Sequence, residues 1–207
     1  MSRSNEMTAP GGHGPLFAAG LALLCMATLM QEILLTRIFS VVTWYHYAFL
    51  AVSVAMFGMT AGAVAVYLLA SRFRSASLGD LLPRLCLYFG FSVVLSCLVQ
   101  IHLPFGSTRT VDYFGSEPLS QALFTLLGCA LISLPFVFNG ACLALIFKTR
   151  HKDIGRIYAA DLSGAGLGCL LLPLILEVLD GPSAALLIAF LGSGRGAGER
   201  GLRGALL

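Results

Sequence analysis

The chain has 207 residues, of which 57% are hydrophobic and only 11% are charged, whereas an ordinary soluble protein has roughly 25% charged residues. Its mean hydropathy is +0.87. Thirteen basic and ten acidic residues are too few to cover the core of a soluble fold with polar surface. The composition excludes a soluble globular domain and indicates a multi-pass membrane protein whose main partner is the lipid bilayer. The net charge of +3 is uninformative, and no nucleic-acid partner is expected.

Five apolar runs reach the length of roughly 20 residues that a helix needs to cross the hydrocarbon of a bilayer. They cover residues 15–38, 45–70, 81–103, 119–147 and 157–179. A sixth apolar run, 182–191, has only ten residues, which is short for a span. The first run is longer than a signal-peptide core and has no small-residue cleavage site, so we expect it to remain as a span. The predicted fold is all-α, a polytopic transmembrane helical bundle with five spans and a short sixth candidate.

The basic residues of the predicted loops lie almost entirely on one side of the membrane. Eight of them fall on the side of the N-terminus, and only Arg109 falls on the opposite side. The eight are Arg3, Arg72, Arg74, Arg84, Lys148, Arg150, Lys152 and Arg156. Because loops rich in Lys and Arg stay in the cytoplasm, the bias predicts a bacterial cytoplasmic (inner) membrane protein with a cytoplasmic N-terminus. Residues 1–14 form the predicted cytoplasmic segment and 15–191 the membrane domain.

The last segment, 192–207, departs from this pattern. It holds six glycines and three arginines, which five spans would place on the outer side. We interpret it as a truncated or frame-shifted end, with a genuine flexible tail as the alternative. Gly196, Gly198 and Gly201 match a dinucleotide-binding pattern by letter, but no strand precedes them and no helix can follow. We expect no nucleotide site there.

The first span carries three polar residues at membrane depth, Gln31, Glu32 and Arg37. An ionisable group inside a span costs roughly 2.5–3.5 kcal/mol on insertion scales, so it is a functional candidate by default. Glu32 and Arg37 are five residues apart, about 140° around a helix, so we expect the partner of Glu32 on another helix. Two interpretations stay open: an interhelical hydrogen bond or ion pair that orients the bundle, and a site for a solute or a proton.

The fourth and fifth spans add further polar candidates. Asn139 follows Pro135 by one turn, and a proline removes a helix hydrogen bond. A plain kink and a broken span with a binding site are both open interpretations. In the fifth span, Tyr158 and Asp161 lie near the cytoplasmic end, where a carboxylate is favoured by the helix dipole.

Small residues recur every four positions in two of the spans. Gly58 and Gly62 do so in the second span, and Gly164 and Gly168 continue from Ala160 in the fifth. This spacing lets two helix backbones approach closely. We expect all four glycines at helix–helix contacts.

No catalytic constellation can be assembled from the sequence. The six cysteines all lie in predicted spans and none forms a C-x-x-C pair, so neither a disulfide framework nor a zinc site is expected. They are Cys25, Cys86, Cys97, Cys129, Cys142 and Cys169. The histidines show no ligand spacing, and no Ser/His/Asp set or phosphate loop is present. We expect no enzymatic activity, no metal and no cofactor in this chain.

Two stretches of the chain resemble a known family. Residues 31–40 (QEILLTRIFS), followed by 44–50 (WYHYAFL), are similar to the start of the membrane region of bacterial membrane-bound spermidine synthase-like proteins. So is Tyr158-Ala159-Ala160-Asp161-Leu162 with Gly164, Gly166 and Gly168, running into Glu177 and 181–184 (GPSA). The likeness covers most of residues 15–191.

The resemblance implies a membrane region that precedes a cytosolic, Rossmann-like domain similar to polyamine aminopropyltransferases. Such a domain transfers an aminopropyl group from decarboxylated S-adenosylmethionine to a diamine, and no part of this chain corresponds to it. The resemblance therefore implies a non-catalytic membrane module that anchors or serves a missing aminopropyltransferase-like domain. The alternative is a small transporter or solute-binding membrane protein, for polyamines or another small cation, that uses Glu32, Asp161 and Asn139. A purely structural assembly subunit is a third interpretation.

Overall fold

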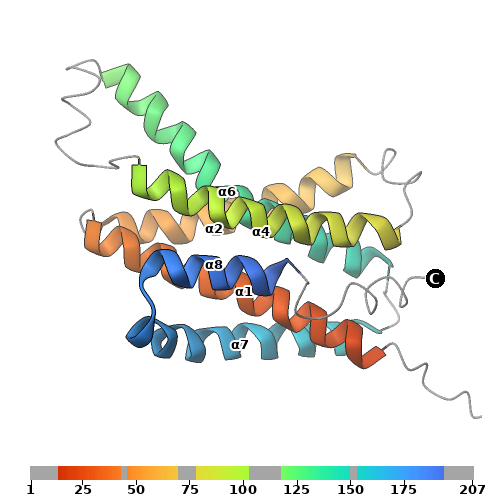
Figure 1. Cartoon of the computed structure of the whole chain (residues 1–207). Helices are drawn as coiled ribbons and strands as arrows, with labels where there is room; N and C mark the ends of the chain where they lie inside the picture. The colour runs from red at the N-terminus through yellow and green to blue at the C-terminus, as the bar shows by residue number, and fades with distance from the viewer. Residues whose placement is uncertain (1–13, 43–45, 70–77, 103–117, 150–152, 194–207) are drawn as a thin grey trace, which may run out of the picture.

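A computed structural model describes residues 14–42, 46–69, 78–102, 118–149 and 153–193. Within these ranges the chain forms six helices and no strand, which confirms the predicted all-α fold (Figure 1). The helices are α1 (Gly14–Val42), α2 (His46–Leu68), α4 (Leu78–His102), α6 (Pro118–Thr149), α7 (Ile154–Val178) and α8 (Gly181–Gly192).

Five of these helices are long and apolar enough to cross a membrane, with apolar stretches of 20 to 28 residues. They coincide with the five predicted spans to within a few residues. The chain is therefore a multi-pass helical membrane protein. The sixth helix, α8, has 12 residues and is about 18 Å long, so it reaches only part of the way through hydrocarbon that is about 30 Å thick.

The first helix organises the bundle. It packs along α7 on one side and against α2 and α8 on the others, while α6 packs against both α2 and α4 (Figure 1). The main apolar core lies between α1, α4, α6 and α8, and Ile157, Ala160 and Leu172 of α7 and Val66 of α2 also belong to it. A smaller core joins the second half of α1 to α2, α4 and α6. Because α7 contacts the bundle mainly through α1, most of its surface is left for lipid.

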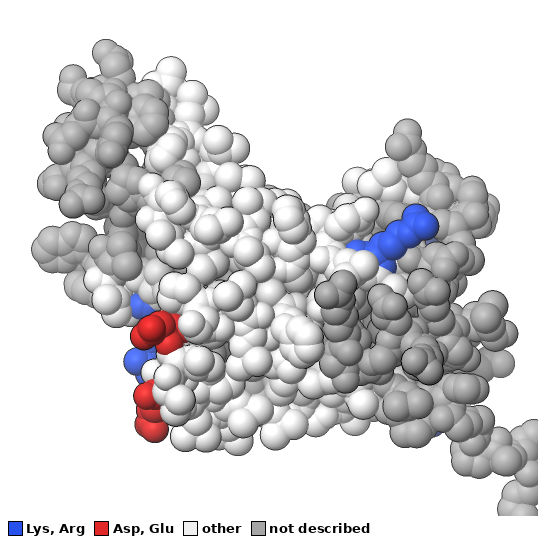
Figure 2. Space-filling view, viewed as in Figure 1, with Lys and Arg blue, Asp and Glu red and all other residues white. Residues whose placement is uncertain are grey.

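Charged side chains lie at the two ends of the bundle, and the surface between them is uncharged in this view (Figure 2). Arg84 near the start of α4, Lys148 in the last turn of α6 and Arg156 in the first turn of α7 belong to one end. Glu177 and Asp180 belong to the other, where α7 ends and α8 begins. Most of the residues that carry the predicted basic bias, including Arg72 and Lys152, lie outside the described residues, as does Arg109 of the opposite side.

The positive-inside rule gives an expected orientation for this axis. We predict that Gly155→Cys, at the start of α7, is labelled by a membrane-impermeant maleimide only from the cytoplasmic side, and Asp180→Cys only from the outside. Both positions are well exposed or unobstructed, so access depends on the side alone. The assay uses intact cells and inverted vesicles in a cysteine-free background. Labelling of Gly155→Cys in intact cells would contradict a cytoplasmic N-terminus.

Candidate functional site

Three amide side chains are buried in the bundle, each on a different helix. Gln31 of α1 and Asn139 of α6 are each 1% exposed, and Gln100 of α4 is 9% exposed. Among the described residues, the side-chain carbonyl oxygen of each amide has no hydrogen-bond partner. An unsatisfied buried acceptor costs roughly 1–3 kcal/mol. These three oxygens are therefore the polar groups of the described helices that most strongly suggest a binding site.

Gln31 and Asn139 border the same apolar core. Gln31 follows Met30 on α1, and Asn139 comes one turn before Cys142 on α6; both neighbours belong to the core between α1, α4, α6 and α8. The α6 helix passes through the fully buried Pro135 without interruption. Both amides can thus accept a hydrogen bond through their side-chain oxygens.

The ionisable residues of α1 take a different position from Gln31. Glu32 is half-buried and Arg37 is exposed. Successive residues of a helix point about 100° apart, so Glu32 is turned away from the direction of Gln31. Neither Glu32 nor Arg37 has an ion-pair partner among the residues that the structure describes. The interhelical partner expected for Glu32 is not found there.

The α7 candidates separate onto two faces. Asp161 is half-buried, and its carboxylate lies near the thiol of Cys25 on α1. Tyr158 is 57% exposed and lies on the side of α7 that faces away from the bundle. The structure therefore brings Asp161 into the α1–α7 contact, and it does not bring Tyr158, Glu32 and Asn139 together into one site.

All four glycines singled out from the sequence lie at close helix contacts. A Cβ atom on Gly164 would overlap the carbonyl oxygen of Ala22 on α1, and one on Gly168 would lie 2.7 Å from the Met26 oxygen. On α2, a Cβ at Gly58 would lie 2.8 Å from the Ser133 oxygen of α6, and one at Gly62 would overlap the Val137 oxygen. The two helix pairs α1–α7 and α2–α6 thus meet backbone to backbone.

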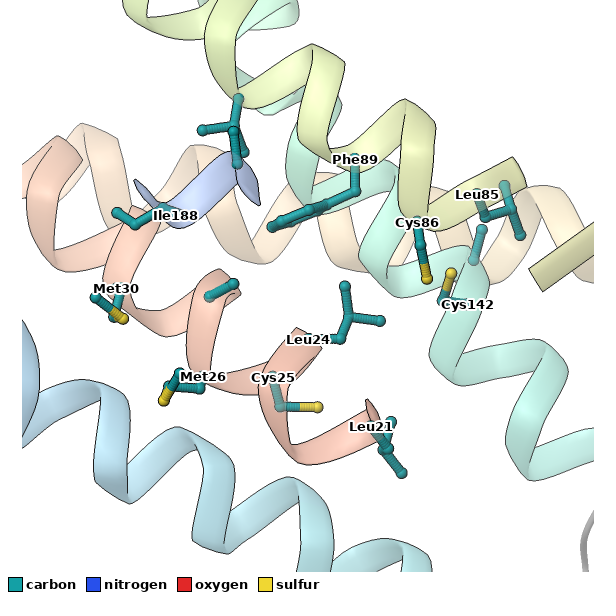
Figure 3. Close-up of a cluster of buried hydrophobic side chains, with 14 of the residues drawn as sticks. Leu21, Leu24, Cys25, Met26, Met30, Leu85, Cys86, Phe89, Cys142 and Ile188 are labelled. Atoms are coloured by element: carbon teal, nitrogen blue, oxygen red, sulfur yellow. The ribbon is translucent and has the colours of Figure 1, made fainter. Parts of the chain in front are cut away.

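Two further features were not predicted. The thiols of Cys86 on α4 and Cys142 on α6 are neighbours, and their sulfur atoms face one another in the core (Figure 3). On α4, Ser92, Ser96 and Gln100 form a buried polar row in which the Gln100 amide nitrogen donates to the Ser96 backbone and hydroxyl oxygens, both at 3.1 Å. The spacing of four residues was a usable signal for that row. Sequence carried no signal for the thiol pair, because its cysteines are 56 positions apart along the chain.

An open, mainly apolar groove with a volume of about 770 Å³ lies between α2 and α6. Its lining includes none of the amides and none of the carboxylates discussed above. No group of three or more His, Cys, Asp or Glu side chains in the described part of the chain is arranged to hold a metal ion. In comparisons with protein-family models, curated proteins and solved structures, nothing matches this chain.

Proposed function

We propose that this chain is a non-catalytic membrane module that anchors or serves a cytosolic aminopropyltransferase-like domain, as its resemblance to spermidine synthase-like proteins implies. The observation that carries the proposal is the α1–α7 contact. There Gly164 and Gly168 bring the two backbones together, and the Asp161 carboxylate lies near the Cys25 thiol. A carboxylate held in a helix–helix contact suits a scaffold better than a solute path. Of the residues that carry the resemblance, 31–40 lie on α1 and 158–168 lie on α7.

An assay of aminopropyl transfer tests this proposal. We expect the purified chain alone to convert no putrescine to spermidine in the presence of decarboxylated S-adenosylmethionine, because its described residues form only membrane helices. We expect the tagged chain, isolated in mild detergent from membranes of the organism that encodes it, to bring that activity with it.

A different multi-pass protein with the same tag, isolated from the same membranes, is the control. Activity in the purified chain would contradict the non-catalytic assignment. Native preparations no more active than the control would contradict the anchoring role.

A second candidate function is binding or transport of a polyamine or another small cation. It is favoured by the partnerless oxygens of Gln31 and Asn139, since an ammonium group carries several donors and no acceptor. Glu32 would supply a negative charge, and because it points about 100° away from Gln31 on α1, it would hold a second ammonium group of a polyamine and not the one held by Gln31. The partial burial of Glu32 leaves it a route to water or to a ligand.

Glu32→Gln separates this candidate from a structural role. The amide keeps the shape and most of the hydrogen bonding of the carboxyl but removes the charge. If Glu32 holds a cation, spermidine binding measured by calorimetry is lost in Glu32→Gln while the melting temperature is unchanged. Glu177→Gln, at the exposed end of α7, is the matched control and should bind as the wild type does. A wild-type protein that binds no spermidine would contradict the polyamine assignment.

A further inference from the structure

A groove opens between α2 and α6 in the half of the bundle where both helices begin. The helices touch at Gly58, where an added Cβ would lie 2.8 Å from the Ser133 oxygen, and the first half of α6 rises away from α2 (Figure 1). The space between them has a volume of about 770 Å³. Its apolar walls are Leu50, Val54 and Phe57 from α2, and Ala122, Leu126 and Ala130 from α6.

The walls of this groove are mainly apolar. Three hydroxyl groups line it, those of Ser53, Thr125 and Ser133. The Ser53 hydroxyl donates to the Phe49 carbonyl oxygen at 3.0 Å, and the Ser133 hydroxyl donates to the Ala130 oxygen at 2.8 Å, so both serines donate within their own helices. No charged side chain is among the described residues that line it. A water molecule needs two or more polar partners to occupy a buried site, so this mainly apolar lining favours an apolar occupant over water.

The groove also lies within the spans. Its residues belong to the apolar stretches Phe49–Leu68 and Ala122–Thr149, and Phe57 and Leu126 on its rim are about 70% exposed, at 71% and 67%. The medium around these side chains is therefore hydrocarbon. An empty groove would forfeit the dispersion contacts of its lining atoms, so an apolar occupant is favoured.

We propose that this groove binds an acyl chain of a membrane lipid. Its volume lies within the roughly 300–1,000 Å³ typical of small-molecule sites. A partner helix, about 10–12 Å across with its side chains, is too wide to reach the closed end, where α2 and α6 meet through Gly58. A flexible acyl chain is narrow enough to follow the wedge down to that contact. This site is independent of both functions proposed above.

Photochemical labelling in the bilayer tests the proposal. The full chain is reconstituted in vesicles that contain phosphatidylcholine with a diazirine on one acyl chain, irradiated, digested and mapped by mass spectrometry. We expect labels on Phe57, Leu126 and Cys129 severalfold above those on Leu170 and Leu174. The latter two are comparably exposed residues of α7 outside any groove. Equal labelling of the two sets would overturn the proposal, because it would mean contact with bulk lipid only.

Two variants complete the test. Ala130→Phe places a ring in the groove and should reduce its labelling to the level of α7, while Cys169→Phe, on the exposed face of α7, should leave it unchanged. If Ala130→Phe fails to fold, Ala122→Phe at the mouth replaces it. Persistent groove labelling in a folded filling variant would overturn the proposal. So would protection of the groove together with oxidative cross-linking of two chains through Cys129, which would identify a second copy as the occupant.

Discussion

Gly164→Leu is expected to destabilise the bundle by roughly 3 kcal/mol or more, at the upper end of the usual cost of overpacking. The physical reason is the backbone of α1. A Cβ atom at this position would overlap the Ala22 carbonyl oxygen and lie 2.7 Å from its carbonyl carbon. A side chain can rotate out of the way, but a helix backbone cannot, so α7 must move away from α1. The measurement is the free energy of unfolding by denaturant titration in detergent.

Gly166→Leu is the matched control, two residues further along the same helix. Gly166 is exposed, and a Cβ there meets nothing within 4 Å. Leucine is the better helix former by somewhat less than about 1 kcal/mol, so this variant should be neutral or slightly stabilised. The pair therefore predicts opposite signs for the same substitution. Equal effects at the two positions would contradict the α1–α7 contact.

The architecture could be predicted from the sequence because a membrane-spanning helix is recognisable by the length and apolarity of its run of residues. A run such as 157–179 must be a helix in hydrocarbon, since every backbone polar group has to be satisfied within its own segment. The ten-residue run 182–191 was a short sixth candidate whose crossing the sequence left open. These inferences use local properties, and the structure adds to them only which helices are neighbours.

The polar site was harder to predict, because it depends on which helices meet. Gln31 and Asn139 were recognisable as polar residues at membrane depth, but the sequence could not show that each is buried with a partnerless oxygen. Glu32 drew attention by its charge, yet it lies at the partly exposed side of α1. The neighbour of the Cys25 thiol, Asp161, is 136 positions away along the chain. No periodicity within one helix records a pairing of that kind.

The close approach of α2 to α6 was predicted from α2 only. Gly58 and Gly62 on α2 showed the four-residue spacing, whereas Gly140 on α6 was not singled out, although Ala144 follows it by four residues. In the structure, a Cβ on Gly140 would overlap the Met59 oxygen, just as one on Gly62 would overlap the Val137 oxygen. Gly62 and Gly140 thus each lie against the backbone of the other's helix, at a single crossing of α2 and α6.

Gly62→Ala and Gly140→Ala should each lower the free energy of unfolding by roughly 1–3 kcal/mol, although alanine is intrinsically the better helix former. A single methyl group is enough, because the overlap is with backbone atoms. Val64→Ala, on the exposed face of α2, is the control and should change stability little, since its side chain faces lipid.

The double variant Gly62→Ala/Gly140→Ala is the sharper measurement. Once one methyl group has pushed α2 and α6 apart, the second meets a gap that already exists and costs less. Residues that share one contact show interaction energies of roughly 0.5–3 kcal/mol, so the double variant should be less destabilised than the sum of the two single variants. Strict additivity in the same denaturant titration would mean that the two glycines act at separate contacts, contrary to the single crossing described here.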